Sequence, residues 1–393
     1  MIRKLSAQYI FPADAPPLKR GIVVVDDKDE ILDLIDTNGH FSEMERLEFY
    51  DGIITPGFVN THTHLELSHL KGCVDKHTGL LGFIRNIGRL RGVASSEEDF
   101  RKADRLMRQN GIVAAGDISN CDDSFRVKAS SPIKYFTFIE LFGVQSDIAA
   151  DKISQGMALY NQLRNYDLSA AVSPHAPYSM SDRLWELLVS LGREQNSIWS
   201  VHNQETFDEN RLFVDKSGAF VDFLNFVDPQ FQSWLPKGCT SFQYCKQFYK
   251  ELQKVLLVHN TFTSKEDITA LADIKDKIVF VLCPNANLYI ENCLPDIDLL
   301  RNSGCLVAVG TDSLASNTNL SVLEELKTLQ HNFSQLTLQE LVSWGTINGA
   351  KALGFDKDLG SISKGKKPGL NLISNINFPE MKLTSQSEVK VLV

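Results

Sequence analysis

The sequence predicts an α/β protein in which a (β/α)8 barrel is joined to a small β-sandwich that both ends of the chain build together. Three observations lead to this fold class. Through the middle of the 393 residues, short apolar runs alternate with longer amphipathic stretches, as in parallel strands wrapped by helices. Both ends of the chain carry strand-like runs without a helical period. Histidines and acidic residues gather where the apolar runs of the middle region end.

The runs at the two ends of the chain predict a separate β-domain. A charged turn separates the first two runs, which is typical of a hairpin. Because chain ends often lie close together, we expect the N-terminal and C-terminal runs to share this domain. It would take residues 1–55 plus 355–393, and the barrel would take residues 56–354. The terminal runs are residues 21–27, 30–36, 368–375 and 387–393.

Eight apolar runs in the middle region are rich in β-branched and aromatic residues, which favours strands. Amphipathic stretches between them, such as residues 182–195 and 319–330, predict helices. Eight strands that alternate with helices indicate a parallel barrel. A long aromatic-rich connection, residues 226–250, would be a pocket wall, a lid or a simple surface excursion. The eight runs are residues 52–60, 111–118, 133–143, 168–176, 197–205, 254–260, 277–285 and 305–312.

Composition narrows the class of protein. The formal net charge is −9 and the basic residues are scattered, which argues against a nucleic acid or an anionic membrane surface as partner. No stretch approaches the ~18 apolar residues of a membrane span, and the N-terminus lacks the apolar core of a signal peptide. The seven cysteines form no CxxC pair, which suggests a reducing compartment. We therefore expect a cytoplasmic protein without a nucleic-acid or membrane partner.

Candidate metal ligands lie at the carboxyl ends of the predicted strands, where such a barrel builds its active site. His62 and His64 end the first strand two residues apart, so both side chains point to the same side and suit a metal such as zinc. His202 ends the fifth strand and supplies a third imidazole, and Asp312 ends the eighth and supplies a carboxylate. Each has a plainer reading: paired surface histidines, a core histidine bonded to the backbone, and the N-cap of the next helix for Asp312.

Three further residues follow the same strand ends. Glu205 lies three residues past His202 and could pass a proton from a metal-bound water to a leaving group, or be a solvated loop acid. His259 could orient the attacking hydroxide or stabilise developing negative charge. His175 lies on a proline-rich turn and either contacts substrate or is a structural histidine. The histidines away from these strand ends are given no metal role: His40, His69, His77 and His331.

Seven segments follow one another in the order and spacing of a known family. They are "PGFVNTHTH" (56–64), "SPHAPYS" (173–179), "HNQET" (202–206), "LVHN" (257–260), "GTDSLASNTNLSVLEEL" (310–326), "INGAKALG" (347–354) and "GSISKGKKPGL" (360–370). With them, nearly the whole chain resembles the amidohydrolase superfamily, and within it the branch of metal-dependent deaminases and chlorohydrolases. That branch holds guanine, cytosine, S-adenosylhomocysteine, methylthioadenosine and aminodeoxyfutalosine deaminases. In "PNAN" (284–287) the chain departs from the family pattern, because Ala286 stands where serine is usual.

The resemblance implies a mononuclear metal site in a distorted (β/α)8 barrel, and a homodimer. The implied metal ligands are His62, His64, His202 and Asp312. Glu205 would be the proton shuttle, His259 would contact the hydroxide or the substrate, and His175 the substrate. One divalent ion is expected, zinc first, with iron or manganese as alternatives because such a site admits all three.

The implied reaction is a deamination, in which a metal-activated water attacks an amidine-like ring carbon, Asp312 accepts its proton and ammonia leaves. The substrate would be an amino-substituted purine or an adenine nucleoside of the aminodeoxyfutalosine type, with guanine, S-adenosylhomocysteine and methylthioadenosine types as alternatives. Glu66 would contact a donor-rich face of this substrate, such as a ribose diol, or be a plain helix-start acid. Three other readings stay open: a chlorohydrolase, a hydrolase of a cyclic amide of the imidazolonepropionase kind, and a non-catalytic binding barrel.

Overall fold

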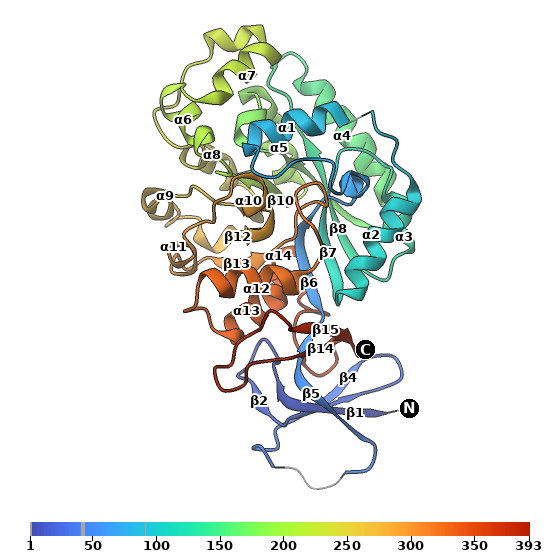
Figure 1. The fold of residues 1–393 in the computed structure, drawn as a ribbon. Coiled ribbons are helices and arrows are strands. Elements are labelled where there is room, and N and C mark those ends of the chain that lie inside the picture. The colour runs from blue at the N-terminus through green and yellow to red at the C-terminus, as the bar shows by residue number, and fades with distance from the viewer. Residues whose placement is uncertain (1, 41–43, 91) are drawn as a thin grey trace.

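The computed structural model describes residues 2–40, 44–90 and 92–393, which form a barrel with a smaller β-domain at one end (Figure 1). Within these ranges, two four-stranded parallel sheets form the barrel wall, in the orders β6-β7-β8-β9 and β10-β11-β12-β13. Parallel strands that alternate with helices confirm the fold class expected from the sequence. The barrel strands are β6 (Phe58–Thr63), β7 (Ile112–Ser119), β8 (Lys134–Leu141), β9 (Ser169–Pro174), β10 (Ile198–Asn203), β11 (Lys254–His259), β12 (Ile278–Leu282) and β13 (Leu306–Val309).

Helices surround the barrel strands (Figure 1). Both helices named from the sequence are confirmed, as α5 and α12. Helix α12 begins later than expected because Ser321 caps it, with a side chain that accepts a hydrogen bond from the backbone N–H of Glu324. Across the described ranges, every helix is too short or too polar to cross a membrane. The helices are α1 (Gly79–Leu90), α2 (Glu97–Gln109), α3 (Phe125–Ser130), α4 (Ala149–Arg164), α5 (Asp182–Glu194), α6 (Phe207–Asp215), α7 (Ala219–Val227), α8 (Ser241–Tyr249), α9 (Lys265–Ala270), α10 (Pro284–Ile290), α11 (Ile297–Arg301), α12 (Val322–Asn332), α13 (Leu338–Gly345) and α14 (Ile347–Leu353).

The two ends of the chain form one further sheet, which confirms the small β-domain. In the described part of the chain it has seven strands, and β5 pairs with β14 so that Ile54 lies opposite Leu372. Strands β3 and β4 form the expected hairpin. The division of the chain at residues 55/56 and 354/355 stays a prediction. The strands are β1 (Arg3–Ile10), β2 (Leu18–Lys19), β3 (Ile22–Val25), β4 (Ile31–Ile35), β5 (Leu47–Pro56), β14 (Leu370–Ser374) and β15 (Glu388–Val391).

One expected strand is divided in the structure. Residues 52–60 were predicted as a single barrel strand, but β5 ends at Pro56 in the terminal sheet and β6 begins at Phe58 in the barrel. The apolar pattern gives no sign of the change because both segments are buried. The chain passes from one sheet to the other at Gly57, where a Cβ would overlap Val113 and lie 2.8 Å from the carbonyl oxygen of Pro368.

The two half-sheets of the barrel adjoin at two seams. At the first, between β13 and β6, the backbone N–H groups of Thr311 and Asp312 donate to the carbonyl oxygen of His62, at 3.0 and 3.1 Å. At the second, between β9 and β10, the Ser173 hydroxyl accepts a hydrogen bond from the backbone N–H of Ser200 (2.9 Å) and donates to its carbonyl oxygen (2.7 Å). The Ser173 side chain thus bridges this seam, and further along it the backbone N–H of His202 donates to the carbonyl oxygen of His175 at 2.8 Å.

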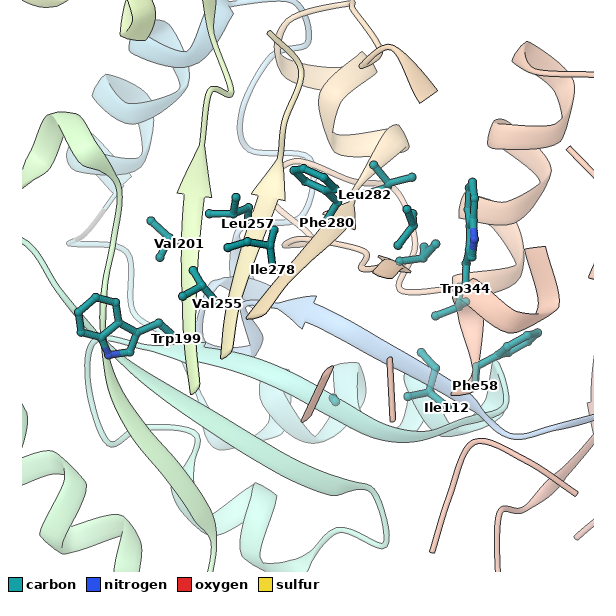
Figure 2. Close-up of a cluster of buried hydrophobic side chains, with 14 of the residues drawn as sticks. Phe58, Ile112, Trp199, Val201, Val255, Leu257, Ile278, Phe280, Leu282 and Trp344 are labelled. Carbon is teal, nitrogen blue, oxygen red and sulfur yellow. The ribbon is translucent and has the colours of Figure 1, made fainter. Parts of the chain in front are cut away.

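Alternate residues of the barrel strands pack into two different apolar layers. In β10, Trp199 and Val201 pack in the layer that includes side chains of α5 and α8, whereas Ile198 belongs to the layer inside the barrel (Figure 2). Figure 2 shows the same outward layer continuing through β11 and β12, with Leu257 and Phe280 among its members. Because side chains alternate along a strand, His202 of β10 faces the barrel interior.

We expect Gly57→Ala to lower the free energy of unfolding by about 1–3 kcal/mol, because the added methyl group has no room between Val113 and Pro368. Urea unfolding followed by circular dichroism measures this difference. Gly88→Ala is the matched control, since a Cβ at Gly88 meets nothing within 4 Å and alanine favours the helix there. Equal stability of the two variants would contradict the close approach at Gly57.

Candidate metal centre and active site

The four residues predicted as metal ligands lie together at one end of the barrel. Their imidazole nitrogens and carboxylate oxygen lie within 4.8 Å of one another. All four side chains are buried. The Nε2 atoms of His62 and His64 are 3.1 Å apart, and Asp312 Oδ1 lies 3.3 Å from His64 Nε2 and 3.7 Å from His62 Nε2. His62 lies in β6 and His202 in β10, whereas His64 directly follows β6 and Asp312 follows β13, so all four lie at strands that border the two seams.

A β-bulge turns the two histidines of β6 toward the site. Between Asn60 and Thr63, three steps along β6 lie opposite two steps along β7, from Ala115 to Asp117. One extra residue changes which side chains face inward, and bulges are frequent beside active sites. The bulge therefore explains why His62 faces the barrel interior, while His64 follows directly after the strand.

Hydrogen bonds fix the ring of His202. Its Nδ1 donates to the carbonyl oxygen of His175 at 3.1 Å, with a carboxylate oxygen of Glu140 at 3.5 Å. With the proton on Nδ1, the lone pair of His202 is on Nε2. A metal-ligating histidine is usually held through its other nitrogen in this way. The reading of His202 as a core histidine bonded to the backbone thus describes only one of its two nitrogens.

Asp312 is held as a ligand would be, and it is not the cap of the next helix, because Ser321 caps α12. Asp312 has φ 54, a left-handed conformation that is uncommon for a residue other than glycine. Its Oδ2 accepts a hydrogen bond from the Ser316 hydroxyl (2.6 Å), which leaves Oδ1 toward the histidines. Gly310 permits this turn, since a Cβ there would lie 2.8 Å from the backbone of His62.

The charges of the four residues match a cation site. Burial lowers the pKa of His62 and of His202, and it lowers the pKa of His64 to about 4. Burial alone would raise the pKa of Asp312, but its interactions with His62, His64 and His259 hold it well below the usual value. Neutral imidazoles and one ionised carboxylate are the donor set of a divalent metal such as zinc. Two neutral Nε2 atoms that face each other at 3.1 Å also favour a cation between them.

Glu205 and His259 lie beside the metal candidates. Both are buried, and Glu205 Oε1 is 3.6 Å from His259 Nε2. Burial raises the pKa of Glu205 well above its usual value, and the charge of Asp312 adds to this shift. Asn287 fixes His259, because its Oδ1 accepts from Nδ1 at 2.8 Å while its amide donates to the Thr261 hydroxyl at 2.7 Å. No role for Asn287 was predicted from the sequence, although the residue lies in the "PNAN" segment.

A cavity of about 940 Å³ opens over these residues. Its polar lining includes both predicted substrate residues, Glu66 and His175, together with His69, for which no metal role was expected. His175 is oriented by the Ser179 hydroxyl, 2.8 Å from its Nδ1. The apolar lining comes largely from two helices, through Phe83, Ile84 and Ile87 of α1 and Phe223, Leu224 and Val227 of α7.

Glu66 faces this cavity with one carboxylate oxygen. Its Oε2 accepts a hydrogen bond from the backbone N–H of Asn120 at 2.8 Å, and the Cys121 thiol lies 3.4 Å from the same oxygen. The Asn120 side chain donates to Oε2 of Glu140 at 3.0 Å. Burial raises the pKa of Glu66 to about 7, and the nearby carboxylates add to the shift. Glu140, Asn120 and Cys121 were missed, although Glu140 follows the strand-end rule that found the others.

The connection 226–250 contributes one residue to the large cavity, Val227. Phe231, Trp234, Lys237 and Tyr244 line a smaller cavity of about 110 Å³ beside it. Lys216 ties this segment down, because its ammonium donates to the carbonyl oxygens of Phe231, Gln232 and Trp234 at 2.7 to 3.0 Å. Lys216 thus fixes residues 231–234 beside the large cavity.

The fold and the site define a parallel barrel with a candidate metal centre at the carboxyl ends of its strands. A model of the amidohydrolase family matches residues 53–392. Adenosine deaminase of Helicobacter pylori is 28% identical over 333 residues, which cover 82% of this chain and 79% of that protein. The chain belongs to the amidohydrolase family.

Two solved structures have the same fold. Aminofutalosine deaminase of Helicobacter pylori in complex with methylthio-coformycin superposes with a TM-score of 0.82 at 24% identity, covering 97% of this chain and 93% of that chain. An adenosine deaminase of Xanthomonas campestris with bound zinc gives a TM-score of 0.75 at 19% identity, covering 99% and 91%. These likenesses confirm the barrel with its small β-domain.

Glu209 provides a test of the packing behind Glu205. It is fully buried on α6, and its carboxylate accepts a hydrogen bond from the backbone N–H of Gln204 at 3.1 Å. Burial raises the pKa of Glu209 from 4.5 to about 7. The folded state therefore binds this proton more tightly than the unfolded state, so the free energy of unfolding falls as the pH rises from about 4.5 to about 7.

We expect Glu209→Gln to remove this pH dependence. The stability of the variant relative to the parent should rise by about 1–3 kcal/mol between about pH 5 and pH 8. Urea unfolding at both pH values, at one fixed metal concentration, measures the change. Glu194→Gln, at an exposed position of α5, should leave the difference constant. A pH-independent difference for Glu209→Gln would contradict the raised pKa.

Proposed function

We propose that this protein is a metal-dependent aminohydrolase that releases ammonia from an amino-substituted purine, with an adenine nucleoside as first candidate. The observation that carries the proposal is the convergence of three imidazoles and a carboxylate with Glu205 and His259 at one end of a large cavity. The names of the similar proteins, adenosine deaminase and aminofutalosine deaminase, support the same reaction class and a purine-like substrate.

One divalent ion would be held by His62, His64, His202 and Asp312. The donor set fits zinc best, with iron or manganese as alternatives, and a similar structure carries zinc. When bound, such an ion supplies Lewis acidity that lowers the pKa of water toward ~7.

The residues around the ion divide the proton transfers. Asp312, whose pKa is held low, is ionised at neutral pH and accepts the proton of the attacking water. Glu205, whose pKa burial raises, keeps its proton and donates it to the ring nitrogen next to the reacting carbon. Asp312 then passes the proton taken from the water to the exocyclic amino group, and Glu205 takes up the proton of the new hydroxyl group, so the carbon–nitrogen bond breaks and ammonia leaves. His259, with its Nδ1 proton bound to Asn287, turns Nε2 toward the site and orients the water. His175 and the free oxygen of Glu66 face the substrate.

The volume and the lining of the cavity favour a nucleoside over a bare base as substrate. A volume of about 940 Å³ is at the upper end of that for small-molecule sites, so it leaves room for a sugar and a substituent beyond the ring. Glu66 offers an acceptor for a ribose diol, and the apolar side chains of α1 and α7 offer a surface for a further apolar group.

Metal content tests the site directly. We expect the purified protein to hold about one equivalent of zinc, iron or manganese, and we expect His62→Ala and Asp312→Ala each to lose it, because each removes a ligand of a buried site. Mass spectrometry of the dialysed proteins measures the ratio. His331→Ala, at an exposed position of α12, is the control and should keep the metal. Retention of metal in both site variants would overturn the ligand assignment.

Activity tests the reaction. Adenosine, 5′-substituted adenosines, guanine and cytosine are supplied to the metal-loaded protein, and ammonia is measured. We expect release from at least one adenine nucleoside, and we expect Glu205→Gln to lower kcat by about 10²–10⁴-fold with little change in KM, because it removes the proton donor. Glu194→Gln should match the parent. Chloride release from a chlorinated ring, or ring opening of a cyclic amide, without ammonia release would replace deamination by those reactions.

A further inference from the structure

A buried carboxylate on α12 lies behind the metal centre and has no part in the proposed reaction. Glu325 is 0% exposed. Its Oε1 accepts hydrogen bonds from the side-chain amides of Asn317 (2.7 Å) and Asn285 (3.0 Å), and its Oε2 accepts one from the backbone N–H of Asn285 (2.9 Å). A carboxylate without such donors would be costly to bury. The three donors come from two separate segments, the loop that holds Asn317 and the first turn of α10, so Glu325 ties these segments to each other.

The first loop carries Asp312. The Asn317 amide that donates to Glu325 also donates to the carbonyl oxygen of Thr311 at 2.9 Å. Thr311 precedes Asp312. The backbone N–H of Thr311 is itself fixed, because it donates a hydrogen bond to Asn60 Oδ1 at 3.0 Å. Displacement of Asn317 would therefore remove one of the two hydrogen bonds that hold the peptide before Asp312, the other being the bond from the Asp312 N–H to His62.

The second segment, the first turn of α10, carries Asn287, the residue that orients His259. Asn285 and Asn287 both lie in the first turn of α10, two residues apart. Asn285 is held by Glu325 through its backbone and its side chain, and its Oδ1 accepts from the Thr328 hydroxyl at 2.6 Å. Asn287 is the partner of His259 Nδ1 at 2.8 Å. The position of this turn thus decides where the His259 ring lies.

We propose that Glu325 is a positioning residue, which fixes the metal ligand Asp312 and the water-orienting His259 relative to each other. Glutamine fits this place poorly, because both oxygens of Glu325 accept from N–H groups and glutamine would turn its own amide toward one of those donors. Mutation of a residue that holds a metal ligand in place typically lowers metal affinity or activity by about 10–100-fold. The inference rests on the proposed function for the roles of Asp312 and His259.

Glu325 reaches Asp312 through Asn317 and His259 through Asn285, and we call these two routes its arms. Breaking one arm should lower metal affinity and breaking the other should lower kcat, and three variants separate these effects. Asn317→Ala breaks the arm to Asp312, so we expect metal affinity to fall about 10-fold or more. Asn285→Ala breaks the arm to His259, so we expect kcat to fall about 10-fold while KM and metal affinity stay near the parent values. Glu325→Gln should show both losses. Glu324→Gln, the exposed neighbour that pairs with Lys327 on the same helix, is the matched control and should show neither.

Zinc affinity is measured by competition with a chromogenic chelator, kcat and KM by ammonia release, and folding by circular dichroism and Tm. Glu325→Gln could have a lower Tm but the zinc affinity and the kcat per bound metal of the parent. That result would show that Glu325 is only a structural residue and would overturn the inference. If Glu325→Gln does not fold, the split between Asn317→Ala and Asn285→Ala decides, and equal losses in both would also overturn it. Absence of zinc from the parent protein would instead overturn the proposed function, whereas a zinc-binding, active parent with unaffected variants overturns this inference alone.

Discussion

The carbonyl oxygen of His62 accepts two backbone hydrogen bonds, from Thr311 at 3.0 Å and from Asp312 at 3.1 Å. These bonds join the first and last strands of the barrel, which are far apart in the sequence. The same peptide of His62 therefore belongs both to the seam and to the metal centre. A carbonyl has two lone pairs and can accept both bonds, and Gly310 leaves the space that the close approach needs. The spacing of the candidate ligands is thus set by the closure of the barrel.

Three residues at the same end of the barrel have a left-handed backbone. Gln204, His259 and Asp312 have φ values of 47, 73 and 54. Such conformations cost about 1–3 kcal/mol each and persist where the surroundings enforce them. Here the surroundings are specific: Glu209 accepts from the N–H of Gln204, Asn287 holds the ring of His259, and Ser316 donates to Asp312. The protein's own hydrogen bonds therefore hold these three residues at the site.

The barrel and four candidate ligands could be predicted from the sequence because both follow from position along strands. An apolar run marks a strand, and a polar residue directly after it lies at the active end. The division at Gly57 could not be predicted, since the apolar pattern continues through it and only the packing of Val113 and Pro368 requires glycine. Asn287 and Glu325 were missed for another reason. They act through a neighbour, and no spacing in the sequence marks a residue whose partner is a side chain on a different loop.

The candidate metal ligands and the residues proposed to contact substrate come from different strands of the barrel. The candidate ligands come from the seam strands, whereas Glu66, Asn120 and Glu140 lie on the segment after β6 and at the ends of β7 and β8. In space the two sets meet where Glu140 lies 3.5 Å from His202 Nδ1, and in the sequence they are closest at His64 and Glu66, two residues apart. Leu65 separates them: its N–H donates to Asp117 at 2.7 Å, and Asp117 is ion-paired with the buried Lys128. This anchor holds the backbone between the candidate ligand His64 and Glu66, the proposed substrate contact, so a different side chain at position 66 would leave His64 in place.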